Sequence, residues 1–266
     1  MDQTEWKNMT LAVCDIAKRA GAYIKEERAK FSLSKVERKH AHDYVSYVDK
    51  GSEERIVSAL RQLLPEAGFI TEEGSAGHNH EQYVWVIDPL DGTTNFIHQY
   101  APYAVSIALM EGRQVIIGVV YEICTDECYY AWHGGGAYIN GNPIHVSQQK
   151  IGDALLCLQL PYKSEAYKPT IKHFIDTFYG HCASIRSMGS AEAELCYVAA
   201  GTIDVYFESF IQPWDVAAGA IIVKEAGGNV SDYDGADAKW ESGRQVLATN
   251  GLLHEAVLQE MQKAKP

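Results

Sequence analysis

The chain has 266 residues, of which 47% are hydrophobic and 22% are charged. This composition is ordinary for a globular protein and excludes chains that are wholly disordered, collagen-like or built on a disulfide scaffold. Asp and Glu outnumber Lys and Arg by 35 to 23, and a net charge of −12 argues against broad binding of nucleic-acid backbones. The excess of carboxylates fits either cation binding or a solvated surface.

Nothing in the sequence indicates a membrane or secreted protein. The chain begins without the basic start and apolar core of a signal peptide, and no apolar run approaches the roughly 20 residues that span a bilayer. The six cysteines are scattered without a paired zinc spacing, which indicates reduced thiols. We therefore expect a cytoplasmic protein that binds neither a membrane nor nucleic acid directly.

The first half of the chain combines amphipathic helices with short strands. Apolar residues at helical spacing predict a helix over residues 4–28. A second helix is predicted over 50–64, where Asp49 is a candidate cap and Pro65 ends the helix. The predicted strands are 69–71, 83–87, 103–110, 115–121 and 128–132, of which the third and fourth form a hairpin.

After about residue 150, strands and helices alternate along the chain. The predicted strands are 154–160, 184–186, 203–207 and 245–248, and the predicted helices are 167–179, 191–200, 216–226 and 252–263. The pattern predicts a layered fold with an α+β half over 1–150 and an α/β half over 151–266. We expect the two halves to share one site and act as a single catalytic unit.

The most informative segment follows the apolar strand that ends near Ile87. The strand delivers Asp88, Asp91 follows three residues later, and Gly92 leaves room for another backbone to approach. The two threonines after Gly92 can begin a helical turn with free N–H groups. Two hard oxygen ligands beside such a turn favour a magnesium ion and a phosphate group. The alternative is an ordinary Asp-Gly turn with capping threonines. It could explain any one of these residues, but it does not explain why all of them follow an apolar strand.

Three other acids have a structural explanation beside a functional one. Asp215 precedes the small-residue run 216–220, where it could be an N-cap worth about 1 kcal/mol. Close packing of that helix could instead bring Asp215 to Asp88. Glu72 could be an exposed loop acid, and Asp49 could be only a helix cap, so the residues alone leave these alternatives open.

The segment from Asp88 to Phe96, Asp-Pro-Leu-Asp-Gly-Thr-Thr-Asn-Phe, resembles the signature of the inositol monophosphatase family. Three other family motifs occur in the expected order, at residues 43–49, 69–73 and 213–219. Thr71 departs from the pattern, because Gly often precedes the two Glu residues of the second motif. The resemblance implies a layered αβαβα sandwich of the inositol monophosphatase and fructose-1,6-bisphosphatase type.

The resemblance also implies up to three magnesium ions in each active site. Glu72, Asp88 and the Leu90 carbonyl match the ligands of a first ion. Asp88, Asp91 and Asp215 match the ligands of a second, and Glu72 helps to hold a third through waters.

The remaining matched residues are implied to act on water, phosphate and substrate. Thr93 matches the hydroxyl that helps to activate the attacking water, and Asp49 matches its carboxylate partner. The backbone N–H groups of Gly92 and Thr93 match the phosphate contacts. A basic residue near the phosphate could be Arg38 or Lys39. The residues matched to inositol hydroxyl contacts are Asp91, the Ala191 backbone and Glu208.

The activity implied by the resemblance is hydrolysis of a phosphate monoester by in-line attack of water. The leading substrate is an inositol monophosphate, and the family is lithium-sensitive and dimeric. Alternative substrates are fructose 1,6-bisphosphate, histidinol phosphate and 3′-phosphoadenosine 5′-phosphate. A further alternative is a binding role with the transcription machinery alongside catalysis.

Overall fold

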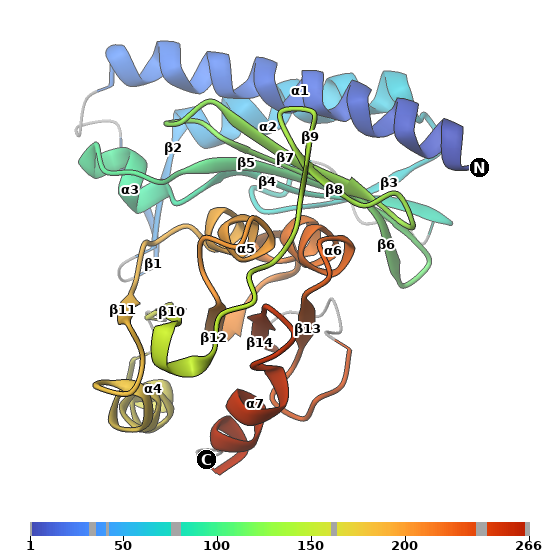
Figure 1. Cartoon of the computed structure of the whole chain (residues 1–266). Helices are drawn as coiled ribbons and strands as arrows, with labels where there is room; N and C mark the ends of the chain where they lie inside the picture. Colours follow the sequence, from blue (N-terminus) through green and yellow to red (C-terminus); the bar gives the residue numbers. More distant parts are fainter. Residues whose placement is uncertain are drawn as a thin grey trace.

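The computed structural model describes residues 2–31, 36–40, 43–75, 81–160, 164–237 and 244–263. Its elements stack in five layers, in the order helices, sheet, helices, sheet, helices (Figure 1). The αβαβα sandwich predicted from the sequence is confirmed.

The helices supply the three α layers. Helices α1 and α2 cover the outer face of the larger sheet, α5 and α6 lie between the two sheets, and α4 and α7 cover the smaller sheet (Figure 1). α1 begins with a capping box in which Asp2 accepts the backbone N–H of Glu5. The helices are α1 (Gln3–Ala29), α2 (Tyr47–Leu63), α3 (Thr93–His98), α4 (Ser164–Phe178), α5 (Ala191–Ala199), α6 (Ala217–Glu225) and α7 (His254–Lys263).

The larger sheet has seven strands in the order β3-β4-β5-β6-β7-β8-β9. Only the β3–β4 pair among these strands is parallel, and the others form an antiparallel meander. The strands are β3 (Gly68–Thr71), β4 (Tyr83–Asp91), β5 (Ala104–Glu111), β6 (Gln114–Glu122), β7 (Glu127–Trp132), β8 (Ala137–Ile139) and β9 (Asn142–Ile144). Both faces are covered by helices, which explains why β5 and β6 are almost continuously apolar.

The smaller sheet has five strands in the order β11-β10-β12-β14-β13. β10 is parallel to β11 and β12, while β14 is antiparallel to both of its neighbours. The strands are β10 (Leu155–Leu158), β11 (Ser184–Arg186), β12 (Val205–Ile211), β13 (Asn229–Ser231) and β14 (Arg244–Thr249), and a separate hairpin pairs β1 (Val36–His40) with β2 (Asp43–Ser46).

Small residues let the middle helices approach their neighbours closely. A Cβ atom on Gly118 of β6 would lie 2.5 Å from the carbonyl oxygen of Ala218 in α6. A Cβ atom on Gly219 would lie 2.5 Å from the Cβ atom of Leu195 in α5. The first turn of α6 is therefore in close contact with both the larger sheet and α5.

Four boundaries that differ from the sequence prediction concern candidate site residues. β4 continues to Asp91, so Asp88 and Asp91 lie within the strand instead of following it. α2 begins at Tyr47, so Asp49 lies inside its first turn and is not the cap. β12 continues to Ile211, so Glu208 lies within the strand instead of at its end. Asp215 belongs to a short 3-10 turn, Pro213–Asp215, and Val216 is the residue that flanks α6.

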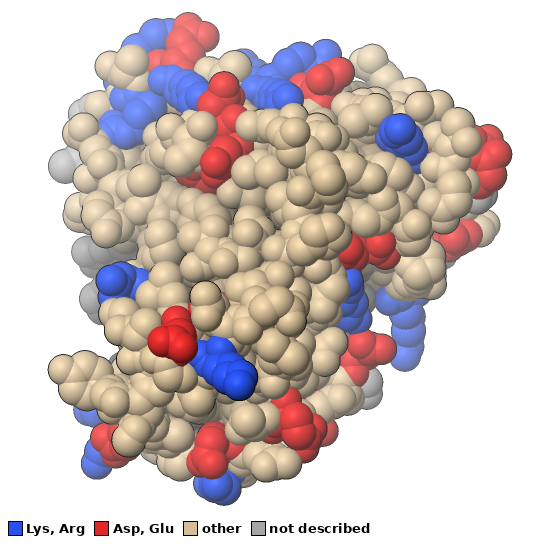
Figure 2. All heavy atoms as spheres, viewed as in Figure 1, with Lys and Arg blue, Asp and Glu red and all other residues tan. Residues whose placement is uncertain are grey.

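The surface carries charges of both signs. Figure 2 shows Lys and Arg interspersed with Asp and Glu along the edge formed by α1, and again around α4 and α7. The middle of this face is largely free of charge (Figure 2). Among the described residues, no helix has the length and apolar character needed to cross a membrane.

Candidate active site

The last residues of β4 bring two carboxylates into the interior. Asp88 is 3% exposed and Asp91 is 7% exposed. The pairing of β4 with β5 is regular up to Asp88 and shifts before Asp91. The Leu90 N–H donates to Asp88 Oδ1 over 2.9 Å, which fixes the carboxylate against its own strand.

Asp88 is the centre of a group of acids that interact through charge. Burial raises the pKa of Asp88 well above its usual value, and the negative charges of Glu72, Asp91 and Asp215 raise it further. The pKa of Asp215 is also raised well above its usual value by burial and by the charges of Glu72 and Glu208. These interactions place side chains from β4, the loop after β3, β12 and the turn before α6 around one site.

Asp91 is held by the start of α5. Its carboxylate accepts hydrogen bonds from the Ser190 hydroxyl, from the Ala191 N–H at 3.1 Å and from the Glu192 N–H at 2.9 Å. Burial raises the pKa of Asp91 to about 6, although these hydrogen bonds favour the charged form. The Ala191 N–H, matched to a substrate contact from sequence, is thus directed at Asp91.

A hydroxyl and a carboxylate meet beside the acids. The Thr93 Oγ1 lies 3.0 Å from Asp49 Oδ1 and 3.1 Å from the Leu90 carbonyl oxygen, and it can donate its proton to either. Asp49 is 1% exposed. The Thr93–Asp49 contact predicted from the family resemblance is therefore formed. Thr93 follows Leu90 by three residues, so the contact lies beside the Leu90 carbonyl.

α2 holds the loop that carries Glu72. Glu53, buried in this helix, accepts the Glu73 N–H and the Ser75 N–H, each over 2.8 Å. Ser52, next to Glu53, and Asp49, one turn earlier, face the end of β4, where the Ser52 hydroxyl donates to the Pro89 carbonyl over 3.0 Å. The same helix thereby connects Asp49, the end of β4 and the loop containing Glu72.

The start of α3 depends on a glycine. Gly92 has φ +85°, which L side chains rarely adopt, and a Cβ atom there would lie 3.1 Å from the Pro102 carbonyl oxygen. α3 begins at Thr93 with no side-chain cap on its first turn. Asn95, within α3, donates to the carbonyls of Pro102 and Met188 at 2.8 and 2.7 Å, which ties the helix to the loop before α5.

Three further acids adjoin these residues: Glu192 and Glu194 are buried in α5, and Glu208 is half-buried in β12. Burial raises the pKa values of Glu192, Glu194 and Glu208 to about 8 in each case. Glu208 accepts the Tyr206 hydroxyl over 2.5 Å, and Glu194 accepts the Met188 N–H over 3.1 Å. Since Glu208 interacts electrostatically with both Asp91 and Asp215, this set adjoins the Asp88 group.

The residues fit a hard cation better than a soft one. The chemical groups gathered here are carboxylates and a backbone carbonyl, which are the ligands that Mg²⁺ prefers. Among the residues that the structure describes, no three His, Cys, Asp or Glu side chains form a ready-made metal cluster. The acids are thus neighbours with mutual repulsion, and a bound cation would lower that repulsion.

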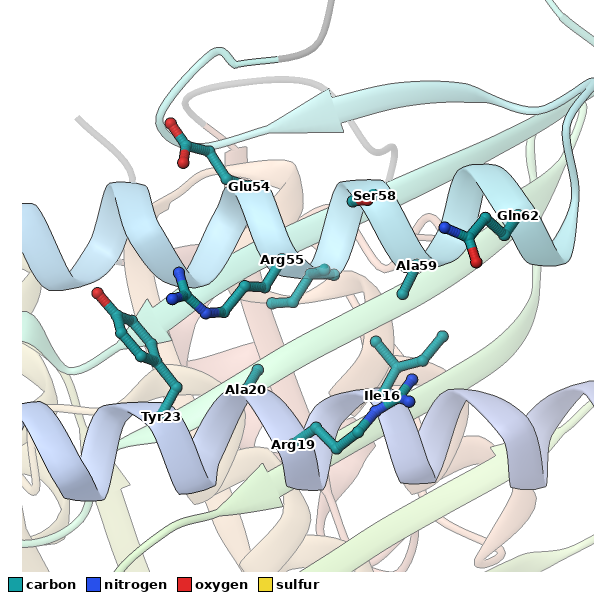
Figure 3. Close-up of a pocket in the computed structure, with 10 residues that line it drawn as sticks. Ile16, Arg19, Ala20, Tyr23, Glu54, Arg55, Ser58, Ala59 and Gln62 are labelled. Atoms are coloured by element: carbon teal, nitrogen blue, oxygen red, sulfur yellow. The ribbon is translucent and has the colours of Figure 1, made fainter.

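A separate cavity of about 590 Å³ lies between α1 and α2. Figure 3 shows Arg55 of α2 directed toward Tyr23 of α1, and its guanidinium lies 3.8 Å from the centre of the Tyr23 ring. Most of the α2 residues that line this cavity, among them Ser58 and Gln62, lie on a different face of the helix from Asp49 and Glu53. The cavity is distinct from the acidic site.

Comparisons with known proteins show the family of this chain. A model of the inositol monophosphatase family matches residues 5–265. The chain belongs to the inositol monophosphatase family. Family membership supports a phosphatase, and the resemblance stated from the sequence motifs is confirmed.

The proteins similar to the present chain carry two kinds of name. The chain is 34% identical over 249 residues to an inositol-1-monophosphatase from Mesorhizobium japonicum, covering 93% of each chain. It is 39% identical over 219 residues to a Nus factor SuhB from Pasteurella multocida, covering 82% of each chain. The solved inositol monophosphatase from Anabaena superposes with a TM-score of 0.85 at 32% identity, covering 98% of this chain and 97% of that one.

Residues whose hydrogen-bond partners are distant along the chain were not identified from the sequence. Glu53, Ser190 and Glu192 hold the matched residues in place, yet none belongs to a local motif that marks such a role. The sequence does carry a signal for Glu192 and Glu194, because these two acids interrupt an otherwise apolar helix. Charged residues are rarely buried, and the structure shows both to be fully buried. The side chains of Arg38 and Lys39 lie outside the described residues.

Proposed function

We propose that this protein is a magnesium-dependent phosphatase whose substrate is an inositol monophosphate, most simply inositol 1-phosphate. The observation that carries the proposal is the juxtaposition of two groups. Glu72, Asp88, Asp91 and Asp215 interact around one site, and the Thr93–Asp49 pair lies beside them. Family membership and the inositol-1-monophosphatase relative support the same activity.

Magnesium would be held by the acids that repel one another. Glu72, Asp88 and the Leu90 carbonyl would hold one ion, while Asp88, Asp91 and Asp215 would hold a second. Glu72 would contribute to a third. Bound magnesium supplies charge neutralisation and activates water toward the phosphate, which this slow reaction needs.

The hydroxyl of Thr93 can act on the attacking water. Because its proton is directed at Asp49 or at the Leu90 carbonyl, its lone pairs are available to accept a hydrogen bond from water. Asp49 is buried next to it and can accept a proton passed through the hydroxyl. The water oxygen forms the new P–O bond while the bond from phosphorus to the alcohol oxygen breaks. The departing alkoxide takes a proton from solvent to give inositol, and Asp49 returns the proton that it accepted to solvent, which leaves phosphate as the other product.

The substrate hydroxyls would meet acids at the edge of the site. Glu208 uses one carboxylate oxygen to accept the Tyr206 hydroxyl, which leaves its other oxygen for a polyol hydroxyl. Asp91 is fixed by three donors and presents its remaining lone pairs in a defined direction. In this proposal Ala191 contributes by orienting Asp91.

A substrate panel tests the proposal. Phosphate release from inositol 1-phosphate is compared with release from fructose 1,6-bisphosphate, histidinol phosphate and 3′-phosphoadenosine 5′-phosphate, with magnesium and with or without lithium. We expect the highest kcat/KM with inositol 1-phosphate, loss of activity in excess EDTA and inhibition by lithium. A higher kcat/KM with another substrate would retain the chemistry and replace the substrate, and full activity in EDTA would contradict the metal dependence.

A second candidate function is a binding role alongside catalysis. It is favoured by the relatives named Nus factor SuhB. In this proposal a cytoplasmic homodimer would associate with the transcription machinery, and its fold, not its phosphatase activity, would be required. The test compares capture of purified RNA polymerase and its elongation factors by wild-type protein and by Asp88→Asn. Equal capture by both supports the binding role, and no capture by either contradicts it.

A further inference from the structure

Glu192 is a fully buried carboxylate in the first turn of α5, and the family motifs assign it no role. Its Oε1 accepts the Ser106 hydroxyl of β5 over 2.9 Å and the Ala218 N–H of α6 over 3.2 Å. Its Oε2 accepts the Gly219 N–H over 2.5 Å. A single side chain thus joins the larger sheet to the N-terminal turn of α6.

The backbone of Glu192 contacts the candidate metal site directly. Its N–H donates to Asp91 Oδ2 over 2.9 Å. The turn that its side chain binds begins two residues after Asp215, one of the proposed magnesium ligands. Glu192 is therefore bonded to Asp91 at one end and to the element that follows Asp215 at the other.

Packing alone does not fix that turn against rotation. Gly118 and Gly219 allow α6 to lie close to β6 and α5, and apart from Glu192 Oε2 their nearest neighbours are backbone and apolar atoms. Apolar contacts are non-directional, whereas two N–H groups that converge on one carboxylate define the orientation of the first helical turn. This orientation sets where the residues immediately before the helix lie.

We infer that Glu192 is a positioning residue, whose side-chain hydrogen bonds hold the start of α6 so that Asp215 stays beside Asp88 and Asp91. The inference rests on the proposed function, because it concerns the arrangement of the proposed magnesium ligands. Partners behind metal ligands have substantial effects on metal affinity in other proteins.

Two substitutions separate hydrogen bonding from charge. Glu192→Gln cannot carry a charge, but its amide oxygen can accept the Gly219 N–H and its amide nitrogen can donate to the Ser106 hydroxyl, so that only the Ala218 N–H loses its acceptor. Glu192→Asp keeps the charge, but it is one methylene shorter and does not reach α6 from the same backbone position. Because Gln keeps the shorter of the two bonds to α6, positioning predicts that the Gln variant lies nearer to the wild type and that the Asp variant resembles Glu192→Ala.

Glu225 provides a matched control. It lies at the other end of α6, and its carboxylate accepts the N–H groups of Gly134 and Gly136 over 2.8 and 2.9 Å. Glu225→Ala therefore also removes a carboxylate that holds two backbone N–H groups, without touching the start of the helix. It is expected to lower thermal stability and leave magnesium binding unchanged.

The experiment is a magnesium titration of the melting temperature for the wild type and these four variants, with phosphate release measured in parallel. We expect Glu192→Ala and Glu192→Asp to raise the magnesium concentration at half-maximal stabilisation by about tenfold, with Glu192→Gln within about threefold of the wild type. If the Ala variant does not fold, the Asp and Gln variants give the same comparison. Circular dichroism before the titration establishes that each variant is folded.

Two results would overturn the inference. Equal magnesium midpoints in the wild type, Ala and Asp variants would show that Glu192 is only structural. A Gln midpoint as high as that of Ala would show that charge, not hydrogen bonding, is responsible. A wild type that magnesium stabilises but that releases no phosphate would instead overturn the proposed function, and the shift in midpoint would still measure the effect of Glu192.

Discussion

The Thr93 hydroxyl has two acceptors and one proton. Asp49 and the Leu90 carbonyl both lie about 3 Å from its oxygen, so a molecule that approaches this oxygen meets a lone pair. That arrangement suits a group that receives a proton, and it does not suit a group that donates one to the substrate.

Replacing this hydroxyl tests its proposed role at the level of one atom. Thr93→Val keeps the shape of the side chain and removes the acceptor, so kcat for inositol 1-phosphate should fall by about 10²–10⁴-fold. Thr93→Ser keeps the hydroxyl and should retain most of the activity. Steady-state phosphate release measures both, and a Val variant with wild-type kcat would exclude Thr93 from proton transfer.

Glu53 gives a second prediction, which concerns the loop that carries Glu72. Glu53→Ala removes the acceptor for the N–H groups of Glu73 and Ser75, so the loop should open more easily, at a cost of about 1 kcal/mol for each lost bond. Hydrogen exchange of these two amides should accelerate. The adjacent Glu54→Ala, on an exposed residue, is the control and should leave both amides unchanged.

At the scale of elements, the sequence predicted most helices and strands because their apolar periodicity is local. The predicted 4–28 helix is α1 (Gln3–Ala29), and the segment 184–186 is β11. Periodicity does not specify which strands become neighbours, so the parallel pairing of β10 with both β11 and β12 came only from the structure.

The same distinction between local and long-range signals explains the site residues. The acids in family motifs could be found because their pattern is contiguous along the chain. Glu192 could not be assigned, because its partners Ser106 and Gly219 are 86 and 27 residues away in sequence. Asp49 is a candidate cap in the sequence, beside its functional match, because nothing local indicates that α2 begins two residues earlier, at Tyr47.

The start of α7 gives a prediction about pH. His254, the first residue of this helix, lies 2.9 Å from the Ser231 hydroxyl and 3.1 Å from the Thr249 hydroxyl. Burial lowers its pKa in the folded state, and the Glu255 charge opposes the shift only partly. The unfolded chain therefore binds a proton more readily, and the histidine lowers stability as pH falls below its unfolded pKa of about 6.5.

Urea unfolding at pH 7.5 and pH 5.5 measures this effect. The free energy of unfolding of the wild type, minus that of His254→Gln, should be smaller at pH 5.5 than at pH 7.5. Taking the difference between the two proteins removes the contribution of the other titrating groups. An equal difference at both pH values would contradict a buried, neutral His254.

At the scale of the whole molecule, the candidate site joins the two halves of the sandwich. Asp88 and Asp91 end a strand of the seven-stranded sheet, while Glu208 lies in the five-stranded sheet and Asp215 lies in the turn between β12 and α6. Like charges from both halves therefore meet in the interior of a chain whose net charge is −12. Repulsion across this boundary should weaken the folded state when no cation is bound.

Magnesium should therefore stabilise the whole molecule, because a ligand that binds only the folded state raises stability by about 2.7 kcal/mol at 100 times its Kd. We expect millimolar MgCl₂ to raise the melting temperature, and KCl of equal ionic strength to raise it less, since screening acts on all charges.

Asp88→Asn should reduce the magnesium effect and leave the metal-free protein at least as stable. Asp204→Asn, which removes a buried carboxylate that accepts the Leu155 N–H, should lower the melting temperature and keep the full magnesium effect. An undiminished magnesium effect in Asp88→Asn would contradict the assignment of Asp88 as the shared ligand.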